Sequence, residues 1–398
     1  MNNPRRLAVW LSIALSLAGI IGCQNKAKSP DKGPQVKAPP SLMPVYIGTF
    51  TDKGSKGIYL VWLKSDTGEL TVPEVVAEAS SPSYLAVPDN GRFLYCVNEI
   101  TGWREKKSGA VSAFAISPDY KTLTLLNQVS SQGEGPTHIS LDRTERVALV
   151  ANYNSGSVAS YPIATDGKLG EAASVDQHRG RGANPQRQDG PHAHCFNVDP
   201  MNRYALSADL GLDKIFVYTL DTNTGQIHPA ATPSFSIAPG SGPRHLAFHP
   251  SGRFLYVINE IKSTITACSY DNSRGTLTEI QTVSTLPADF QGQNTTAEIA
   301  MHPSGKFLYG SNRGHDSIAI FTIDQQSGKL TASGHQSTQG KMPRGFGIDP
   351  SGTFLLAANQ DTDNVVVFRI DQQTGALNPT GGSAQVPTPV CVTYPMQK

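Results

Sequence analysis

Short apolar runs separated by turn residues recur along the chain, and this pattern predicts paired β-strands. In the segment GPRHLAFHPSGRFLYVINE (242–260), the apolar runs 246–248 and 254–258 flank His249-Pro250-Ser251-Gly252, which is typical of a turn. Related segments lie at 81–99, 135–153, 190–209, 295–313 and 342–360, with starts roughly 47 to 55 residues apart. The chain is therefore built from repeats of one β-rich unit.

Each unit continues with a second pair of β-rich runs. After Glu260 these runs are 264–270 and 277–283, joined by DNSRG, and the same Asp-x-x-x-Gly linker recurs at 221–225, 324–328 and 371–375. Each unit thus predicts four short antiparallel strands, here called A, B, C and D in chain order. Four strands in about 50 residues, repeated, are typical of a β-propeller.

Six units begin with a complete A–B pair, and the seventh is split between the chain ends. Residues 46–50, 57–63 and 70–77 resemble strands B, C and D, and 388–394 resemble the missing strand A. Pairing of these ends would close the ring and leave no open seam. We predict an all-β fold over 44–398: a seven-bladed β-propeller of four-stranded blades, closed by its C-terminal strand A against N-terminal strands B to D. A solenoid or two sandwiches would not explain the split unit.

The N-terminal segment is expected to lie outside this fold. Arg5 and Arg6 precede the apolar stretch 7–21, which predicts a secretory signal over 1–22 and is too short for a confident membrane span. Its ending resembles a bacterial lipoprotein box, in which Cys23 would be lipidated; a plain signal peptide or a short anchor is the alternative. Residues 23–43, rich in Lys and Pro, predict a disordered tether. We expect an exported lipoprotein of the periplasm or cell envelope.

Charge and cysteine spacing limit the kinds of partner and cofactor that the chain is expected to bind. The net charge of +1 gives no electrostatic case for binding nucleic acid. The cysteines after the signal lack the spacing of a metal or redox site, so we expect no metal, no cofactor and single buried thiols, although an exported chain could form disulfides. These cysteines are Cys96, Cys195, Cys268 and Cys391.

Propeller topology places the start of strand A and the end of strand B on one face, near one mouth of the central channel. The opposite face carries ordinary turn residues such as Pro-Ser-Gly. A recurring asparagine at the end of strand B, as in Asn98 and Asn259, is expected to be structural and to bond the backbone at the B–C turn. The residues placed there include Tyr84, Glu99, His138, Tyr153 and Asp209. Those that break the repeat are charged or titratable: His192, His194, Arg244, Glu260, Glu298, Arg313 and Arg344, with His245 beside Arg244. They predict a functional pocket.

One loop on the same face breaks the repeat. The connection 176–194 is longer than its counterparts and carries Arg179, Arg181 and Arg187. We predict a basic flap over the mouth that holds an anionic substrate; a solvated loop is the alternative for Arg179 and Arg181.

Four stretches resemble a known family, the seven-bladed propeller lactonases. They are NPQRQDGPHAH (184–194), GPRHLAFHPSGRFLYVINE (242–260), TTAEIAMHPSGKFLYGSNRGHDSIAIF (295–321) and MPRGFGIDPSG (342–352), and the similarity covers essentially everything after the tether. The family includes propeller-type bacterial 6-phosphogluconolactonase and fungal carboxy-muconate lactonising enzymes (cycloisomerase 2). The resemblance implies carbohydrate metabolism and a site at His192 or His194, Arg244, Glu260 and Arg313. The phosphogluconolactone enzyme works in the cytoplasm, whereas this chain is predicted to be exported, so the resemblance does not determine its substrate.

We therefore expect a monomeric hydrolase for a small, anionic sugar lactone, reaching the membrane only through its lipid. No Gly-x-Ser-x-Gly nucleophile motif is present, which favours direct attack by water. His194 or Glu260 is the candidate base and His192 the weaker one.

Arginines supply the other expected roles. Arg244 would stabilise the oxyanion, and Arg187, Arg313 and Arg344 would hold the anionic group. Glu298 would pair with one of these arginines, and His245 would contact substrate. The alternatives are a muconate-type cycloisomerase and a non-catalytic envelope propeller that binds a ligand or protein.

Overall fold

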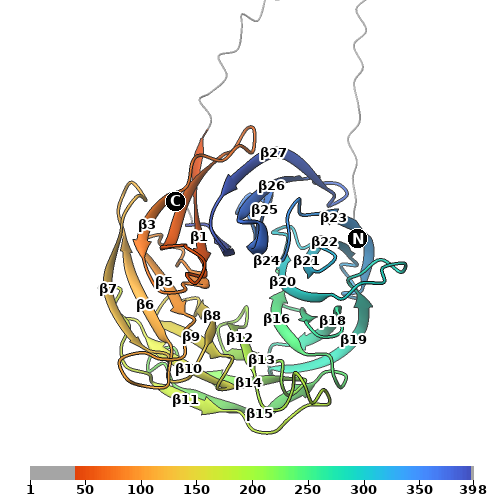
Figure 1. The fold of residues 1–398 in the computed structure, drawn as a ribbon. Helices are drawn as coiled ribbons and strands as arrows, with labels where there is room; N and C mark the ends of the chain where they lie inside the picture. The colour runs from red at the N-terminus through yellow and green to blue at the C-terminus, as the bar shows by residue number, and fades with distance from the viewer. Residues whose placement is uncertain (1–40, 396–398) are drawn as a thin grey trace, which may run out of the picture. The chain divides into compact units, whose positions relative to one another are not determined.

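A computed structural model describes residues 41–395, which form seven four-stranded antiparallel sheets around a common centre (Figure 1). The predicted signal at 1–22, Cys23 and most of the predicted tether lie outside the described residues. The first strand already begins at Leu42, two residues before the predicted start of the domain at residue 44. Within the described chain, no helix is both long and apolar enough to span a membrane.

Six blades follow one another along the chain, and each takes its four strands in sequence order, from A at the centre to D at the rim. The first three are β4(Tyr84–Ala86), β5(Phe93–Asn98), β6(Ala110–Ile116) and β7(Leu123–Ser130); β8(Pro136–Leu141), β9(Val147–Asn152), β10(Ser157–Pro162) and β11(Ser174–Gln177); and β12(Ala193–Val198), β13(Tyr204–Asp209), β14(Lys214–Leu220) and β15(Ile227–Ser236). The next three are β16(Pro243–Phe248), β17(Phe254–Asn259), β18(Thr264–Asp271) and β19(Thr276–Ser284); β20(Thr295–Met301), β21(Phe307–Arg313), β22(Ser317–Ile323) and β23(Leu330–Ser337); and β24(Pro343–Ile348), β25(Phe354–Asn359), β26(Asn364–Ile370) and β27(Leu377–Gln385).

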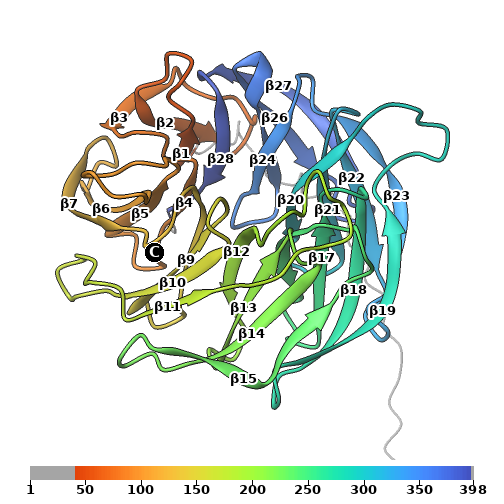
Figure 2. The same cartoon turned by 60° about the horizontal axis from the view of Figure 1, so that its bottom comes forward.

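The seventh blade joins the two ends of the described chain, as predicted. Strand β28(Pro389–Thr393) pairs antiparallel with β1(Leu42–Thr49), which continues into β2(Gly57–Lys64) and β3(Glu74–Glu78). Figure 2 shows β28 between β1 and β24, where it completes the circle of innermost strands. The outermost strand of this blade is shorter than the predicted 70–77, because Leu70 forms only an isolated bridge with Leu63 before β3 starts at Glu74.

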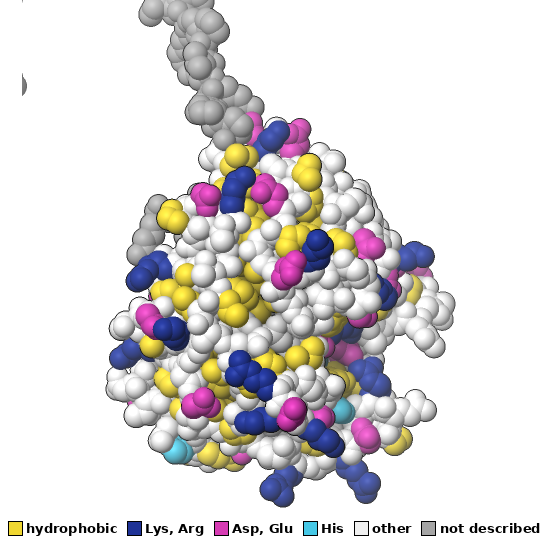
Figure 3. Space-filling model, turned by 60° about the vertical axis from the view of Figure 1, so that its left-hand side comes forward, with side chains coloured by type: hydrophobic (Ala, Val, Ile, Leu, Met, Phe, Trp, Pro, Cys, Tyr) yellow, Lys and Arg dark blue, Asp and Glu magenta, His cyan; other side chains and the backbone are white. Residues whose placement is uncertain are grey.

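The core lies between neighbouring sheets. Alternate residues of the middle strands face the blade before and the blade after, so that each cluster is shared by two blades; Val97 of β5, for example, packs with Val150 of β9. Among the described residues all four cysteines are buried and free, in agreement with the sequence analysis. Figure 3 shows the side of the ring that carries β3 and β7, where basic and acidic side chains are interspersed.

The recurring asparagines are buried and structural, but their partner differs from the one predicted. Asn98 Nδ2, for example, donates to the carbonyl of Ser80 at 2.8 Å, just after the outermost strand of the preceding blade. The bond therefore joins two blades through the D–A connection and does not close the B–C turn. Corresponding bonds run from Asn152 to Ser131, Asn312 to Thr285 and Asn359 to Thr338. Asn259 instead donates to Thr264 and Thr266.

Candidate functional site

The charged residues predicted at one mouth of the ring are brought together around Glu260. Antiparallel pairing places Pro243 opposite Asn259 and Thr295 opposite Arg313, so strand A starts and strand B ends share one edge. Glu260 Oε2 lies 3.0 Å from Arg244 Nε and 2.9 Å from Arg313 Nη2, and all three side chains are at most 7% exposed. The Arg244 N–H is not directed at the carboxylate in hydrogen-bond geometry, so this contact is an ion pair by proximity.

A third arginine reaches the same carboxylate from the long loop. Arg187 Nη2 lies 2.5 Å from Glu260 Oε1. Burial raises the pKa of Glu260, but the charges of Arg313, Arg244 and Arg187 outweigh it and hold this pKa at about 2. Glu260 is thus an anion shared by three cations, with a low affinity for protons at neutral pH.

His194 is a neutral side chain in the same cluster. It is 4% exposed, and its Nδ1 has no hydrogen-bond partner. Burial, followed by the nearby charge of Arg244, lowers the pKa of His194 well below its usual value. The imidazole therefore remains uncharged at neutral pH and retains a lone pair, which suits a general base better than Glu260 does.

A β-bulge explains why His194 faces the centre. Ala193 pairs with Asp209 and Cys195 with Ala208, so His194 is an extra residue outside the ladder. The same irregularity occurs near the start of every other strand A except β4, and bulges redirect a side chain in this way. The extra residues are Thr137, His194, Arg244, Arg344 and Val390, together with the pair Ala297 and Glu298.

We call the inward residues at this position the bulge ring. Its members are Ser83, Thr137, His194, Arg244, Glu298, Arg344 and Val390, one from each blade, and all line one small void of about 10 Å³. Ser83 stands at the corresponding place in the first blade, directly before β4.

A larger pocket of about 380 Å³ shares members of the bulge ring. Its predicted residues are Arg187, His194, Glu260, Arg313 and Arg344, and Glu99, Thr137, Tyr153, Asn154 and Thr295 complete the wall. Arg244, also predicted for the site, lines the void and not this pocket. Thr137 and Thr295 carry no charge, so nothing in the sequence marked them. Glu99 and Tyr153 stand directly after strand B, and the sequence analysis placed both on this face for that reason.

Arg344 is the least firmly paired arginine of the pocket. Its Nη2 lies 3.8 Å from Glu99 Oε1, and its guanidinium stands 5.0 Å from the centre of the Phe50 ring. This arrangement leaves donors of Arg344 available to a bound anion.

Two other predicted residues lie around the void. His245 Nδ1 is 2.9 Å from Glu298 Oε1, so the structure pairs Glu298 with a histidine and not, as predicted, with an arginine. Burial lowers the pKa of His245, whereas the interaction with His245, followed by the charge of Arg244, lowers the pKa of Glu298 against the effect of burial. A neutral His245 therefore donates Nδ1–H to an ionised Glu298, and its Nε2 is 3.4 Å from Arg244 Nη1, where it can accept a hydrogen bond.

His192 is separated from the other candidates. Its ring stacks on the Tyr153 ring with the centroids 4.5 Å apart, and its Nδ1 is 3.0 Å from the Tyr153 carbonyl oxygen. Of the described residues that line the pocket, none is His192. Regular alternation would place His192 and His194 on the same side, but the bulge at His194 interrupts it.

The long loop is anchored at both ends. His178 is fully buried, with Nδ1 2.6 Å from Asp209 Oδ2 and Nε2 2.9 Å from the Tyr218 hydroxyl. Gln188, also fully buried, donates to the Leu210 carbonyl at 2.8 Å. These anchors fix the position from which Arg187 enters the pocket, whereas the predicted flap residues Arg179 and Arg181 are exposed.

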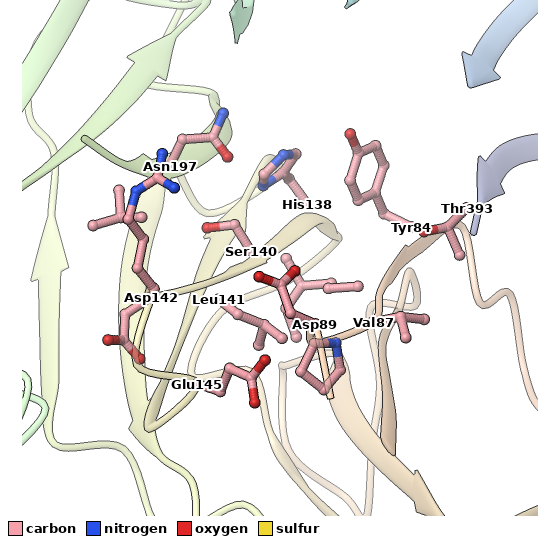
Figure 4. Close-up of a pocket in the computed structure, with 15 residues that line it drawn as sticks. Tyr84, Val87, Asp89, His138, Ser140, Leu141, Asp142, Glu145, Asn197 and Thr393 are labelled. Atoms are coloured by element: carbon pink, nitrogen blue, oxygen red, sulfur yellow. The ribbon is translucent and has the colours of Figure 1, made fainter. Parts of the chain in front are cut away.

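A cavity of about 510 Å³ runs along the innermost strands β4, β8 and β12, from Tyr84 and His138 to the A–B turns that follow β4 and β8 (Figure 4). Two of its three carboxylates hold the turns: Asp142 accepts hydrogen bonds from the backbone N–H groups of Arg146 and Val147, and Glu145 accepts one from that of Asn90. This agrees with the turn function predicted for that face and leaves the Glu260 cluster as the candidate site.

Comparisons with known proteins show which family the chain is similar to. The family model described as "Lactonase, 7-bladed beta-propeller" matches residues 44–394. A 6-phosphogluconolactonase of Bacillus subtilis is 38% identical over 76% of this chain and 84% of its own length. A putative 6-phosphogluconolactonase from Bacteroides fragilis superposes with a TM-score of 0.83 at 38% identity, covering 89% of this chain and 98% of its own. A periplasmic gluconolactonase from Pseudomonas aeruginosa has a TM-score of 0.84 at 33% identity, covering 89% and 99%.

Proposed function

The chain belongs to the seven-bladed β-propeller lactonase family, and on that premise we propose that it is a lactonase that hydrolyses a sugar lactone with an anionic group. The observation that carries this proposal is the neutral, buried His194 beside Glu260 and its three arginines. This arrangement supplies a base and positive charge in one pocket, as lactone hydrolysis requires.

The reaction proceeds by attack of water on the lactone carbonyl carbon. His194 accepts the proton that water loses as its oxygen bonds to carbon. Arg244 lines the adjoining void and not the pocket wall, and from there its charge stabilises the negative charge on the carbonyl oxygen; loss of a comparable donor lowers the rate by about 10² to 10³ in other enzymes. The ring oxygen then leaves, takes up the proton from His194, and the product is the open-chain acid.

Glu260 holds the arginines in place. Without its carboxylate, three guanidinium groups would lie close together in a buried site, and their mutual repulsion would spread them. Arg313 is also fixed by its hydrogen bond to the Thr296 carbonyl at 2.8 Å.

An anionic group on the substrate follows from the charge of the site. The pocket and the void beneath it are lined by four arginines (Arg187, Arg244, Arg313 and Arg344) and three glutamates (Glu99, Glu260 and Glu298), an excess of one positive charge when the histidines are neutral. Arg344 is the natural partner of a phosphate or carboxylate, because it is the least committed of the four.

The cellular compartment of the enzyme determines which lactones it can encounter as substrates. The predicted signal and lipidated Cys23, together with the periplasmic location named for the Pseudomonas aeruginosa protein, favour an exported enzyme. Mass spectrometry of the mature N-terminus tests this: a diacylglyceryl group on Cys23 is expected, and an intact Met1 would contradict it.

A panel of sugar lactones, with and without phosphate, tests the function. Purified protein is incubated with each lactone at weak buffering, and acid release is followed by the fall in pH. Catalysed opening is expected for at least one phosphorylated or carboxylated lactone. No turnover above background on the whole panel, with loss of muconate absorbance in a parallel assay, would favour cycloisomerisation; no turnover in either, with saturable binding of a protein partner, would favour a binding propeller.

A further inference from the structure

The void inside the bulge ring has the size of one water molecule. Its volume is about 10 Å³, which corresponds to one water-sized probe sphere and is at the lower limit for a hydrated cavity. It lies against the substrate pocket, since the two share Glu99, Thr137, His194 and Arg344.

Three polar atoms on residues of its wall lack a hydrogen-bond partner: Ser83 Oγ, His194 Nδ1 and Arg244 Nε. Arg244 Nε lies 3.0 Å from Glu260 Oε2 as an ion pair, whereas Ser83 Oγ and His194 Nδ1 have no such contact; these two residues come from the first and third blades and are 5% and 4% exposed. Buried hydroxyl and imidazole groups are rarely left unpaired, because leaving water without compensation is costly.

A third partner is available on the same wall. Glu298 Oε1 is held by His245, but Oε2 has only a long contact of 3.5 Å with the Tyr84 hydroxyl. The void therefore offers a ring nitrogen, a hydroxyl and a carboxylate, and a buried water typically makes about three hydrogen bonds.

We infer that this void binds one ordered water molecule, which accepts the Nδ1–H of His194, donates to Glu298 and has Ser83 Oγ as its third partner. Ser83 is then a positioning residue that acts on the reaction through the water and His194. The second half of this inference rests on the proposed lactonase function.

The water determines which nitrogen of His194 carries the proton. A neutral imidazole has one N–H, and an acceptor at Nδ1 keeps the hydrogen there and leaves the lone pair on Nε2. The water and Glu298 thereby serve His194 as a directly bonded aspartate serves the histidine of a catalytic triad.

Substitutions at Ser83 test the inference. Ser83→Val places two methyl groups at the void and excludes the water, whereas Ser83→Ala removes one partner and leaves the space. We expect kcat to fall at least tenfold in Ser83→Val, with KM changed less than twofold, and to fall less in Ser83→Ala. The matched control is Ser207→Val, because Ser207 is also a fully buried serine with an unpartnered hydroxyl but stands on β13, outside the bulge ring. It is expected to leave kcat unchanged.

Two readouts do not depend on activity. A crystal structure at high resolution is expected to show density within hydrogen-bond distance of both Ser83 Oγ and His194 Nδ1. Nitrogen chemical shifts measured by NMR are expected to show the Nδ1–H tautomer of His194 in the unsubstituted protein and a mixture of tautomers in Ser83→Val.

The outcomes separate this inference from the proposed function. If the protein opens no lactone, the function fails, and density and tautomer still decide whether the water site exists. If lactones are opened but Ser83→Val keeps its kcat and the Nδ1–H tautomer, the inference is overturned while the function stands. Absence of density in the void overturns it in either case.

Discussion

Replacing Glu260 with glutamine removes the charge that organises the site and nearly preserves its shape. The pKa of Glu260 falls from 4.5 to about 2 in the folded protein, which corresponds to about 3 kcal/mol of stabilisation at about 1.36 kcal/mol per unit. Breaking a buried ion pair from one side costs a similar amount, about 3–5 kcal/mol. With an unfolding entropy of about 2.1 cal/mol/K per residue over the 355 described residues, Glu260→Gln is expected to lower Tm by about 4 °C at pH 7.

The pH dependence identifies the cause of this shift. The pKa of Glu260 is lower in the folded than in the unfolded state, so its contribution is fully present above pH 4.5 and is lost as the pH falls towards about 2. Thermal unfolding followed by circular dichroism from pH 7 to pH 3 should therefore show the two Tm values converging below pH 4.5.

Glu69→Gln is the matched control, since this carboxylate is 57% exposed and pairs with Lys64 at the surface. Exposed pairs contribute little, so its Tm should stay within about 1 °C of that of the unsubstituted protein. A Glu260→Gln shift no larger than the control, or one that persists unchanged to pH 3, would refute the reasoning.

Three further predictions concern catalysis. The kcat/KM profile should keep its plateau at pH 6.5 and fall only at lower pH, because burial holds the pKa of His194 well below its ordinary value; a midpoint at or above pH 6.5 in steady-state assays would contradict His194 as the base. Arg244→Ala, confirmed as folded by circular dichroism, should lower lactone turnover at least tenfold, and an unchanged rate would remove its assigned role. Arg344→Gln should raise KM for a phosphorylated lactone about tenfold or more and leave KM for its neutral counterpart within twofold; equal effects on both would show that Arg344 does not bind the anionic group.

The fold was predictable because the repeat is visible in the sequence. Each unit shows its own strand pattern, and only the split seventh unit lacks a strand A next to its strands B to D, so 388–394 could be recognised as the missing strand. The convergence of Arg244, Glu260 and Arg313 followed from antiparallel pairing, which determines where strand ends lie. Both inferences depend only on the course of the backbone, and the repeated strand pattern in the sequence determines that course.

Side-chain pairing within the site was not predictable in the same way. Whether His192 or His194 faces the site depends on the bulge at the start of strand A. This bulge has no sequence signature, because the bulged position is threonine, histidine, arginine or valine in different blades. The pairing of Glu298 with His245 joins side chains of two blades and depends on packing at the centre of the ring.

The bulge ring gives this architecture a modular design. On the bulged strands, each member of the ring has no paired residue on strand B. Strand pairing therefore constrains the identity of its side chain only weakly. The seven positions, one per repeat, can carry different side chains on the same backbone, but because all of them line one void, a change at one is expected to depend on its neighbours. A redesign of specificity on this scaffold would therefore vary these seven positions together with the pocket residues outside the ring, Arg187, Glu260 and Arg313.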